Sequence, residues 1–317
     1  ATKMLKQNQT KMNEFILLGI SDDAEQQIPL FFLFALIYIF TLLGNFVIIT
    51  VIYLSPQLHN PMYFLLCNLS FIDLSSASIT QPKLLSMLLL RENTISYGGC
   101  IAQLYSFMLF TGTEFFSLTA MAYDRYVAIC KPLRYHILMN NTICVRITST
   151  CWVLGMVDPL PHTVLITQLS FCGSHVINHF FCDMSVVLKL SCVDTSFIES
   201  MTYLFGLLVE FPVFLLLVIS YCCILCAILK IHSAKDRSKA FSTCSSHLIV
   251  VILFYGTVWI MYLRPLSQYS ADHSKPFSLL YTAIIPLVNP FIYSLRNRDL
   301  KTNIKKMYSI RLLLYLQ

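Results

Sequence analysis

The sequence predicts an all-α membrane protein, a bundle of seven transmembrane helices with the amino terminus outside. Hydrophobic residues make up 56% of the 317 residues and charged residues only 12%, about half of the 25% usual in soluble domains. Seven apolar stretches of about 20 residues or more are each long enough to cross a hydrocarbon core of about 30 Å. They are Pro29–Tyr53, Pro61–Leu88, Cys100–Ile129, Ile143–Ile166, Phe197–Leu229, Ala240–Leu263 and Pro276–Ser294.

The basic residues set the orientation of these helices, because cytoplasmic loops carry an excess of Lys and Arg. With the amino terminus outside, 14 of the 22 Lys and Arg fall on the inner side. The chain then divides into an extracellular tail (1–28), a transmembrane domain (29–294) and a cytoplasmic tail (295–317). This topology also accounts for the net charge of +6, so we expect membrane lipid and no nucleic acid as a partner.

The predicted outer side contains a glycosylation sequon and four cysteines. The sequon begins at Asn8 in the extracellular tail. An even number of cysteines in an oxidising space indicates disulfide bonds, and four cysteines allow three pairings. Position alone leaves the choice among these pairings open. The four are Cys100, Cys172, Cys182 and Cys192.

Ionisable residues inside the apolar stretches are candidate functional groups. Asp73 and Glu114 lie in the middle of the second and third stretches. A buried carboxylate must be paired, bind a cation or take up a proton. A sodium ion, a shared proton and a purely structural hydrogen-bonded cluster are all compatible with this pair. Asp124 and Arg125 lie where the third stretch meets water.

Several short motifs together resemble the odorant-receptor family of rhodopsin-like G-protein-coupled receptors. They occur in the family's order over nearly the whole chain, and the class II branch is the closer match. Motifs of this kind gain weight from their structural context, here the seven spans. The segments are Gly44-Asn45, Leu58–Phe64, Pro82-Lys83, Met121–Cys130, Lys131–Tyr135, Ser220-Tyr221, Lys239–Leu248 and Pro286–Asn297.

The resemblance implies specific roles for polar residues and cysteines. It pairs Cys100 with Cys182 and Cys172 with Cys192. It groups Asn45, Asp73 and Glu114 with Asn289 in a polar core. His247 is interpreted either as a satisfied polar residue or as a pH-sensitive latch. The implied G-protein switch at the inner face consists of Asp124, Arg125, Tyr126, Tyr221, Asn289 and Tyr293.

A ring of mainly apolar side chains toward the outer ends of the helices is the predicted ligand site. No side chain of this ring carries a charge, so it suits a small, neutral, mostly apolar ligand. Phe107 stands where amine receptors carry Asp, and the seventh span has no Lys after Pro276 for a retinal Schiff base. The ring consists of Leu104, Phe107, Met108, Thr111, Phe205, Leu208, Tyr255, Val258, Trp259, Tyr262, Leu279 and Thr282.

The function implied by the resemblance is a plasma-membrane receptor for a small volatile odorant. It would activate a stimulatory heterotrimeric G protein and raise cAMP. A transporter or channel is less favoured, because the sequence has neither an internal repeat nor paired broken helices. A membrane enzyme is also less favoured, because no serine elbow, metal-spaced His pair or acidic dyad is evident. We therefore expect no catalytic residues and no cofactor.

Overall fold

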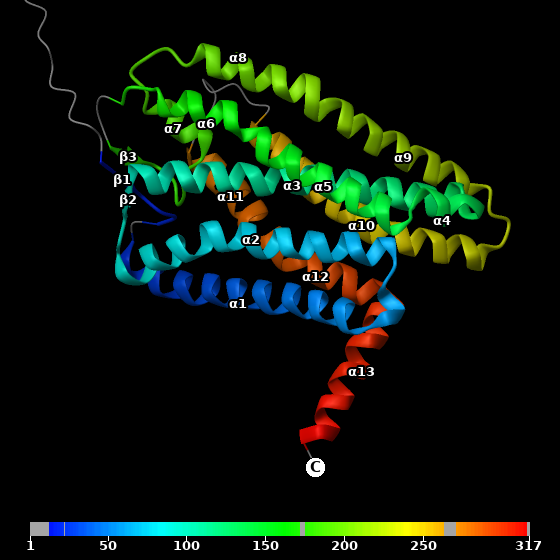
Figure 1. Ribbon diagram of the computed structural model, residues 1–317. Coiled ribbons are helices and arrows are strands. Elements are labelled where there is room, and N and C mark those ends of the chain that lie inside the picture. The colour runs from blue at the N-terminus through cyan, green and yellow to red at the C-terminus, as the bar shows by residue number, and fades with distance from the viewer. Residues whose placement is uncertain (1–12, 22, 172–174, 263–270, 316–317) are drawn as a thin grey trace, which may run out of the picture.

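The protein folds as a seven-helix bundle, seen here in a computed structural model that describes residues 13–21, 23–171, 175–262 and 271–315 (Figure 1). Among these residues, six helices are long and apolar enough to cross a membrane. The seventh, α3, is not among these six and contains the charged residues Glu114, Asp124 and Arg125. It runs through the middle of the bundle and packs against α2, α5, α9 and α10.

Of the seven predicted helices, the first three are continuous, the sixth is continuous as far as it is described, and the fourth, fifth and seventh are divided. The continuous ones are α1 (Ala24–Leu54), α2 (Pro61–Leu90) and α3 (Tyr97–Cys130). The sixth is α10 (Ala234–Tyr262), the last described segment before residue 271. The divided ones are the fourth, α5 (Asn141–Val157) with α6 (Pro159–Thr167); the fifth, α8 (Ser196–Phe205) with η3 (Gly206–Glu210) and α9 (Phe211–Leu229); and the seventh, α11 (Ala271–Leu279) with η5 (Leu280–Ile284) and α12 (Ile285–Arg296).

Each division of a helix has a local cause. The fourth helix breaks at Asp158, since Pro159 and Pro161 have no amide hydrogen to donate. In the fifth and seventh helices, the segments η3 and η5 are single π-helical turns. A π-helical turn holds an additional residue, so it rotates every side chain that follows it relative to an uninterrupted α-helix.

The starts of the helices are set by capping residues. The side chains of Asn60, Ser96 and Asn140 accept hydrogen bonds from backbone amides in the first turns of α2, α3 and α5. These bonds satisfy amides that have no partner within the helix. Short helical segments join the longer helices. They are η1 (Pro56–Leu58) between α1 and α2, and η2 (Pro132–Arg134) with α4 (Tyr135–Leu138) between α3 and α5.

A small sheet closes one end of the bundle, which we call the sheet end. Strand β1 (Glu14–Leu17) pairs antiparallel with β2 (Thr94–Ser96) and parallel with β3 (Val176–Ile177). Phe15 and Leu17 alternate with exposed residues and are fully buried. The helix α7 (Met184–Lys189) packs beside this sheet, and its Val187 belongs to the same apolar cluster.

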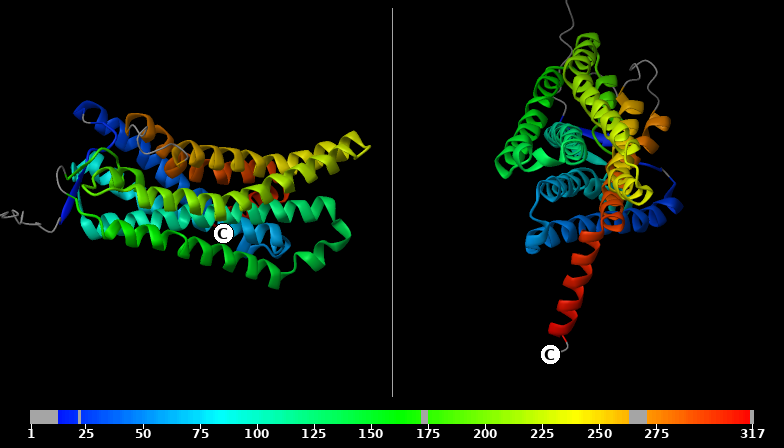
Figure 2. Two further views of the ribbon diagram at one scale, coloured as in Figure 1. Left: turned by 90° about the horizontal axis from the view of Figure 1, so that it is seen from above. Right: turned by 90° about the vertical axis from the view of Figure 1, so that its right-hand side faces the viewer.

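The last helix, α13 (Arg298–Tyr315), leaves the bundle at the opposite end and runs away from it, as Figures 1 and 2 show. The sides of the bundle carry exposed large apolar residues, including Phe32 and Phe46 on α1 and Leu216 on α9. An apolar belt of this kind is the surface that lipid covers.

Candidate functional site

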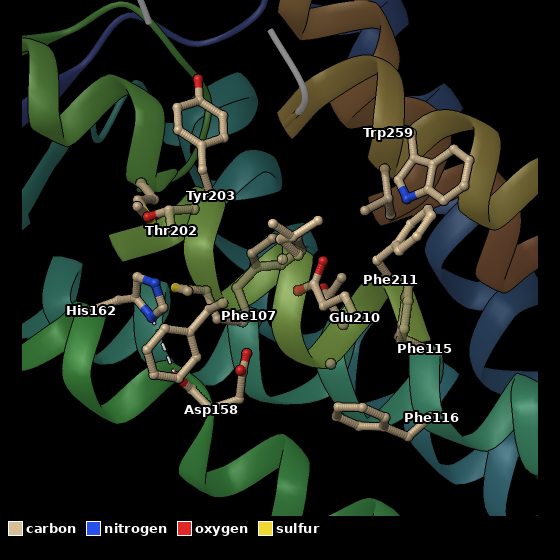
Figure 3. Close-up of a pocket in the computed structure, with 18 of the residues that line it drawn as sticks. Phe107, Phe115, Phe116, Asp158, His162, Thr202, Tyr203, Glu210, Phe211 and Trp259 are labelled. Atoms are coloured by element: carbon tan, nitrogen blue, oxygen red, sulfur yellow. Dashed lines mark hydrogen bonds between the residues drawn. The ribbon is translucent and has the colours of Figure 1, made fainter. Parts of the chain in front are cut away.

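A cavity of about 580 Å³ lies within the bundle toward the sheet end. Its walls come from α3, α6, α7, α8, η3, α9 and α10 (Figure 3). Cavities of about 300–1,000 Å³ with mainly apolar walls are typical of small-molecule sites. The lining residues are Phe107, Met108, Thr111, Gly112, Phe115, Phe116, Asp158, His162, Asp183, Met184, Thr202, Tyr203, Phe205, Gly206, Leu207, Glu210, Phe211, Val258 and Trp259.

Half of the predicted ring lines this cavity. Phe107, Met108 and Thr111 from α3 do so, as do Phe205, Val258 and Trp259. The side chain of Tyr262 lies outside the parts that the structure describes. The predicted ring residues that do not line the cavity are Leu104, Leu208, Tyr255, Leu279 and Thr282.

Leu208 corrects the sequence-based ring, because its side chain is 64% exposed on the outer surface of the bundle. The prediction placed Phe205 and Leu208 on one face of a regular α-helix. The π-helical turn η3 changes the rotation between them. As a result Leu208 turns outward, and Glu210 and Phe211 line the cavity instead.

The polar groups of Tyr255 and Thr282 are occupied by the protein itself. The Tyr255 hydroxyl donates to the backbone oxygen of Phe115 at 2.9 Å and shares a second hydrogen bond with Thr119. Tyr255 therefore joins α10 to α3 from outside the cavity. The Thr282 hydroxyl donates within its own helix to the oxygen of Ser278 at 2.7 Å.

Leu104 and Leu279 also lie away from the cavity. Leu104 is fully buried in the cluster beneath the sheet. Leu279 packs on the main core as a partly buried residue.

The cavity contains ionisable side chains that the sequence ring omitted. Asp158, His162, Asp183 and Glu210 all line it. Figure 3 shows the carboxyl groups of Asp158 and Glu210 directed toward the centre of the labelled residues. Asp158 and Glu210 lie at the irregular parts of the fourth and fifth helices. The sequence feature that could have pointed to Asp158 is the neighbouring Pro159, which marks the break in the fourth helix.

The loop that leads to Asp183 and Met184 of the cavity wall is held by a disulfide bond and by buried polar contacts. Cys100 at the start of α3 is bonded to Cys182, as the sequence analysis expected. Gln103 accepts a hydrogen bond from the Cys182 amide at 2.9 Å. In the same loop, the ring of His179 is hydrogen-bonded to Ser278 at 3.2 Å. Burial lowers the pKa of His179 to about 3, so the ring is neutral.

Two further predictions on this side concern residues outside the described ranges. Cys192 is disulfide-bonded, but its expected partner, Cys172, lies outside the described residues. Asn8, the expected glycosylation site, also lies outside them. Both stay predictions.

Deeper in the bundle, the polar core joins α2 to the seventh helix. The Asn289 side-chain amide donates to both carboxylate oxygens of Asp73 at 3.1 Å. Asn45 donates to the backbone oxygen of Pro286 at 3.0 Å. Glu114 is buried, and one of its oxygens has no hydrogen-bond partner among the described residues. Glu114 lies close enough to interact electrostatically with Asp73.

At the end opposite the sheet, Arg125 forms an ion pair with Asp124, which is only 1% exposed. The hydroxyl of Tyr135 donates to the other oxygen of Asp124 at 2.8 Å. Asp124 thus joins its own helix to α4. Burial raises the pKa of Tyr135, so the phenol remains a donor.

The remaining predicted switch residues lie around this ion pair. Tyr221 of α9 is hydrogen-bonded to His247 of α10. Tyr293 is buried, and its hydroxyl has no partner among the described residues. Tyr126 is half-buried, with the Lys131 amine 5.5 Å from its ring centre.

A seven-helix bundle with an apolar cavity near one end and a buried ion pair near the other is the arrangement of a G-protein-coupled receptor. The chain matches the family model for olfactory receptors over residues 34–311. The chain belongs to the olfactory receptor family.

Individual relatives match along almost their entire length. The chain is 47% identical to olfactory receptor 5AR1 of Mus musculus over 304 residues, which cover 96% of this chain and 98% of that receptor. It is 48% identical to olfactory receptor 5AP2 of Mus musculus over 300 residues, 95% of each. It is 47% identical to olfactory receptor 1G1 of Gorilla gorilla gorilla over 304 residues, 96% of this chain and 97% of that receptor.

Membership of this family defines a class of protein. The chain is an odorant-sensing G-protein-coupled receptor and a multi-pass protein of the plasma membrane. The family is not one of enzymes.

Proposed function

We propose that this receptor binds a small, neutral, mostly apolar odorant in the cavity and activates a stimulatory heterotrimeric G protein, which raises cAMP. The observation that carries the proposal is that the cavity and the Asp124–Arg125 ion pair both involve helix α3. One end of this helix lines the cavity with Phe107 and Thr111, and the other end holds the Asp124–Arg125 ion pair. A ligand that fits the cavity better in one arrangement of the helices shifts the population toward that arrangement.

The proposed orientation puts the sheet end outside the cell, with residues 1–28 as the extracellular tail and 295–317 as the cytoplasmic tail. The Cys100–Cys182 bond supports it, because disulfide bonds persist in oxidising compartments. Activation would then rearrange Arg125, Tyr221 and Tyr293 at the inner face to admit the G protein. Asn289 would link this movement to the polar core.

The polar core has three alternatives for its buried acids: a purely structural hydrogen-bonded cluster, a bound sodium ion and a shared proton. A bound sodium ion and a shared proton would each relieve the repulsion between Asp73 and Glu114. Among the described residues, no three His, Cys, Asp or Glu side chains are grouped as a metal site. Any sodium ion would therefore rely on oxygens from Asn45 or the backbone as well.

Transfected cells provide the test. A panel of neutral volatiles should raise cAMP without opening an ion conductance of the receptor itself. Thr111→Val should weaken potency roughly tenfold, the loss expected for about 1.4 kcal/mol. Phe107→Ala should weaken it at least as much, because the ring packs against Phe181 and Tyr281 and leaves a void. Ion flux without cAMP would favour a channel instead.

A further inference from the structure

The cavity wall formed by the fourth and fifth helices contains two carboxyl groups without a hydrogen-bond partner among the described residues. The side chains of Glu210 and Asp158 form no hydrogen bond or ion pair there, although Asp158 lies close enough to His162 to interact with it electrostatically. The two carboxyl groups also lie close enough to each other to interact electrostatically. Two unpaired carboxyl groups in an apolar cavity are costly unless another group satisfies them.

His162 adds a third unsatisfied group to the same wall. Its side chain is only 3% exposed, and its ring packs edge-on against Phe205 with ring centres 5.3 Å apart. Its Nδ1 faces the backbone oxygen of Asp158 at 3.3 Å, which is the dashed line in Figure 3. Its Nε2 is buried and has no partner among the described residues.

The hydrogen bond at Nδ1 determines what Nε2 can do. A carbonyl oxygen only accepts, so Nδ1 must carry the proton. In the neutral ring, Nε2 is then an acceptor. The wall therefore combines two carboxyl groups with an imidazole, and in every protonation state their oxygen and nitrogen acceptor atoms outnumber the protons that they can carry. We call Asp158, His162 and Glu210 the acceptor corner.

We propose that the acceptor corner binds the polar group of the ligand, and that this group is a hydrogen-bond donor, a hydroxyl or an amine. The inference rests on the proposed odorant function and names its ligand class. Of the two donors, a hydroxyl agrees with the neutral ligand proposed above, and a charged amine would replace that neutral ligand. The donor group sits against Glu210 and Asp158, while the hydrocarbon part lies along the aromatic wall of Phe211 and Trp259. A ligand carboxylate is disfavoured, because it brings only acceptors to a wall that already has too few donors.

The acceptor corner is distinct from a metal site. Among the described residues, no three His, Cys, Asp or Glu side chains are grouped to hold an ion. It also adds a second contact to the one that the sequence favoured, because a ligand hydroxyl can accept from Thr111 while it donates to the acceptor corner. Thr111 lines the cavity from α3, whereas the acceptor corner comes from the fourth and fifth helices.

The test uses matched probes in cells that express the full receptor and report cAMP. Each set shares one apolar skeleton (octyl, cyclohexylethyl or phenylethyl) and ends in a hydroxyl, a primary amine, a methyl ether or a carboxylate. Donor-bearing probes should be at least tenfold more potent than the matching ethers, and the carboxylates should be inactive. A response confined to alcohols or to amines supports the proposal and identifies the source of the donor.

Variants of Glu210 separate the two sources. Glu210→Gln keeps an acceptor oxygen but removes the charge, so it should spare alcohols and weaken amines at least tenfold. Glu210→Leu should weaken both. Leu208→Ala is the matched control, because that side chain is on the outer surface. Surface labelling of every variant excludes a folding failure, and if Glu210→Leu is not expressed, the Gln variant and the probe series decide.

Two contrary results have different meanings. If ethers or carboxylates match the alcohols and amines in potency, the acceptor corner is not the ligand contact, yet the receptor still senses volatiles through cAMP. If no probe of any class raises cAMP in a receptor that reaches the surface, the proposed function fails and the ligand inference fails with it.

Discussion

Tyr221 and His247 have nearly parallel rings and are hydrogen-bonded across the interface of α9 and α10. Their rings are 17° from parallel with centres 5.8 Å apart, and the tyrosine hydroxyl contacts Nδ1 of the histidine. Both side chains are buried. The contact lies at the Arg125 end of the bundle, so it is one of the bonds that must change if α9 and α10 separate there.

A double-mutant cycle should detect this contact as a coupling between the two residues. Tyr221→Phe and His247→Phe each remove the hydrogen bond and keep a ring. Hydrogen bonds between membrane helices average about 0.6 kcal/mol and reach about 1.7 kcal/mol. The double variant should therefore lose less thermal stability in detergent than the sum of the single losses. Strictly additive shifts in the melting midpoint would argue against the coupling.

Arg125→Ala should abolish ligand-driven cAMP while surface expression stays measurable. Arg125 is the only basic residue in α3 and is paired with Asp124. A conservative partner variant, Tyr135→Phe, removes the other contact to Asp124 and keeps the arginine. It should reduce expression or raise basal activity without abolishing the response. Normal signalling by Arg125→Ala at the surface would refute the switch role.

Gly155→Ala should destabilise the receptor by about 1–3 kcal/mol through overpacking. A methyl group at this position would lie 2.1 Å from the Thr113 hydroxyl oxygen and 3.0 Å from the backbone oxygen of Leu109. Gly256→Ala is the control, because nothing lies within 4 Å of the added group. Thermal midpoints in detergent should fall for the first variant and stay unchanged or rise for the second, because Ala favours the helix more than Gly does.

The native state should lose stability in acid through His179. An unfolded histidine binds a proton below about pH 6.5, whereas the pKa of about 3 keeps His179 neutral in the folded protein. The unfolded state therefore binds more protons between these values, and stability falls as pH drops through this interval by up to about 1.4 kcal/mol per pH unit. His179→Gln should flatten this dependence of the melting midpoint. An unchanged slope would remove His179 as its source.

Peptide mapping under non-reducing conditions should recover Cys172 linked to Cys192. The bond would close a loop of about 20 residues, worth a few kcal/mol in the chain-entropy model. The structure already pairs Cys100 with Cys182. A peptide joining Cys100 to Cys172 would contradict both assignments.

The sequence was sufficient for the helices and for part of the polar core, but not for the contacts Tyr221–His247 and Tyr135–Asp124. Hydropathy gave the spans, and charge type at the middle of a span identified Asp73, which Asn289 indeed contacts. Helical spacing failed where the helix itself is irregular. A π-helical turn has no pattern in hydropathy, so the change from Leu208 to Glu210 could be found only in three dimensions.

Tyr255 shows a second limit of sequence reasoning. Spacing places it on the inward face of α10, and it is buried there. Whether an inward hydroxyl faces a ligand or another helix depends on how closely two helices approach. Here α3 comes near enough for Phe115 to accept the hydrogen bond.

The π-helical turn η3 also sets the rotation of α9 about its axis relative to the cavity. Glu210 ends the turn, and Tyr221 follows on the same unbroken helix, α9. At 3.6 residues per turn, the interval between them is close to three whole turns, so both side chains lie on one face. Any rolling of α9 about its axis that moves the cavity wall must therefore carry the tyrosine through the same arc. Relaxing η3 to a regular α-helical turn would roll α9 by the equivalent of one residue. A change in this irregular turn would therefore move the cavity wall and the Tyr221 ring, which contacts His247, at the same time.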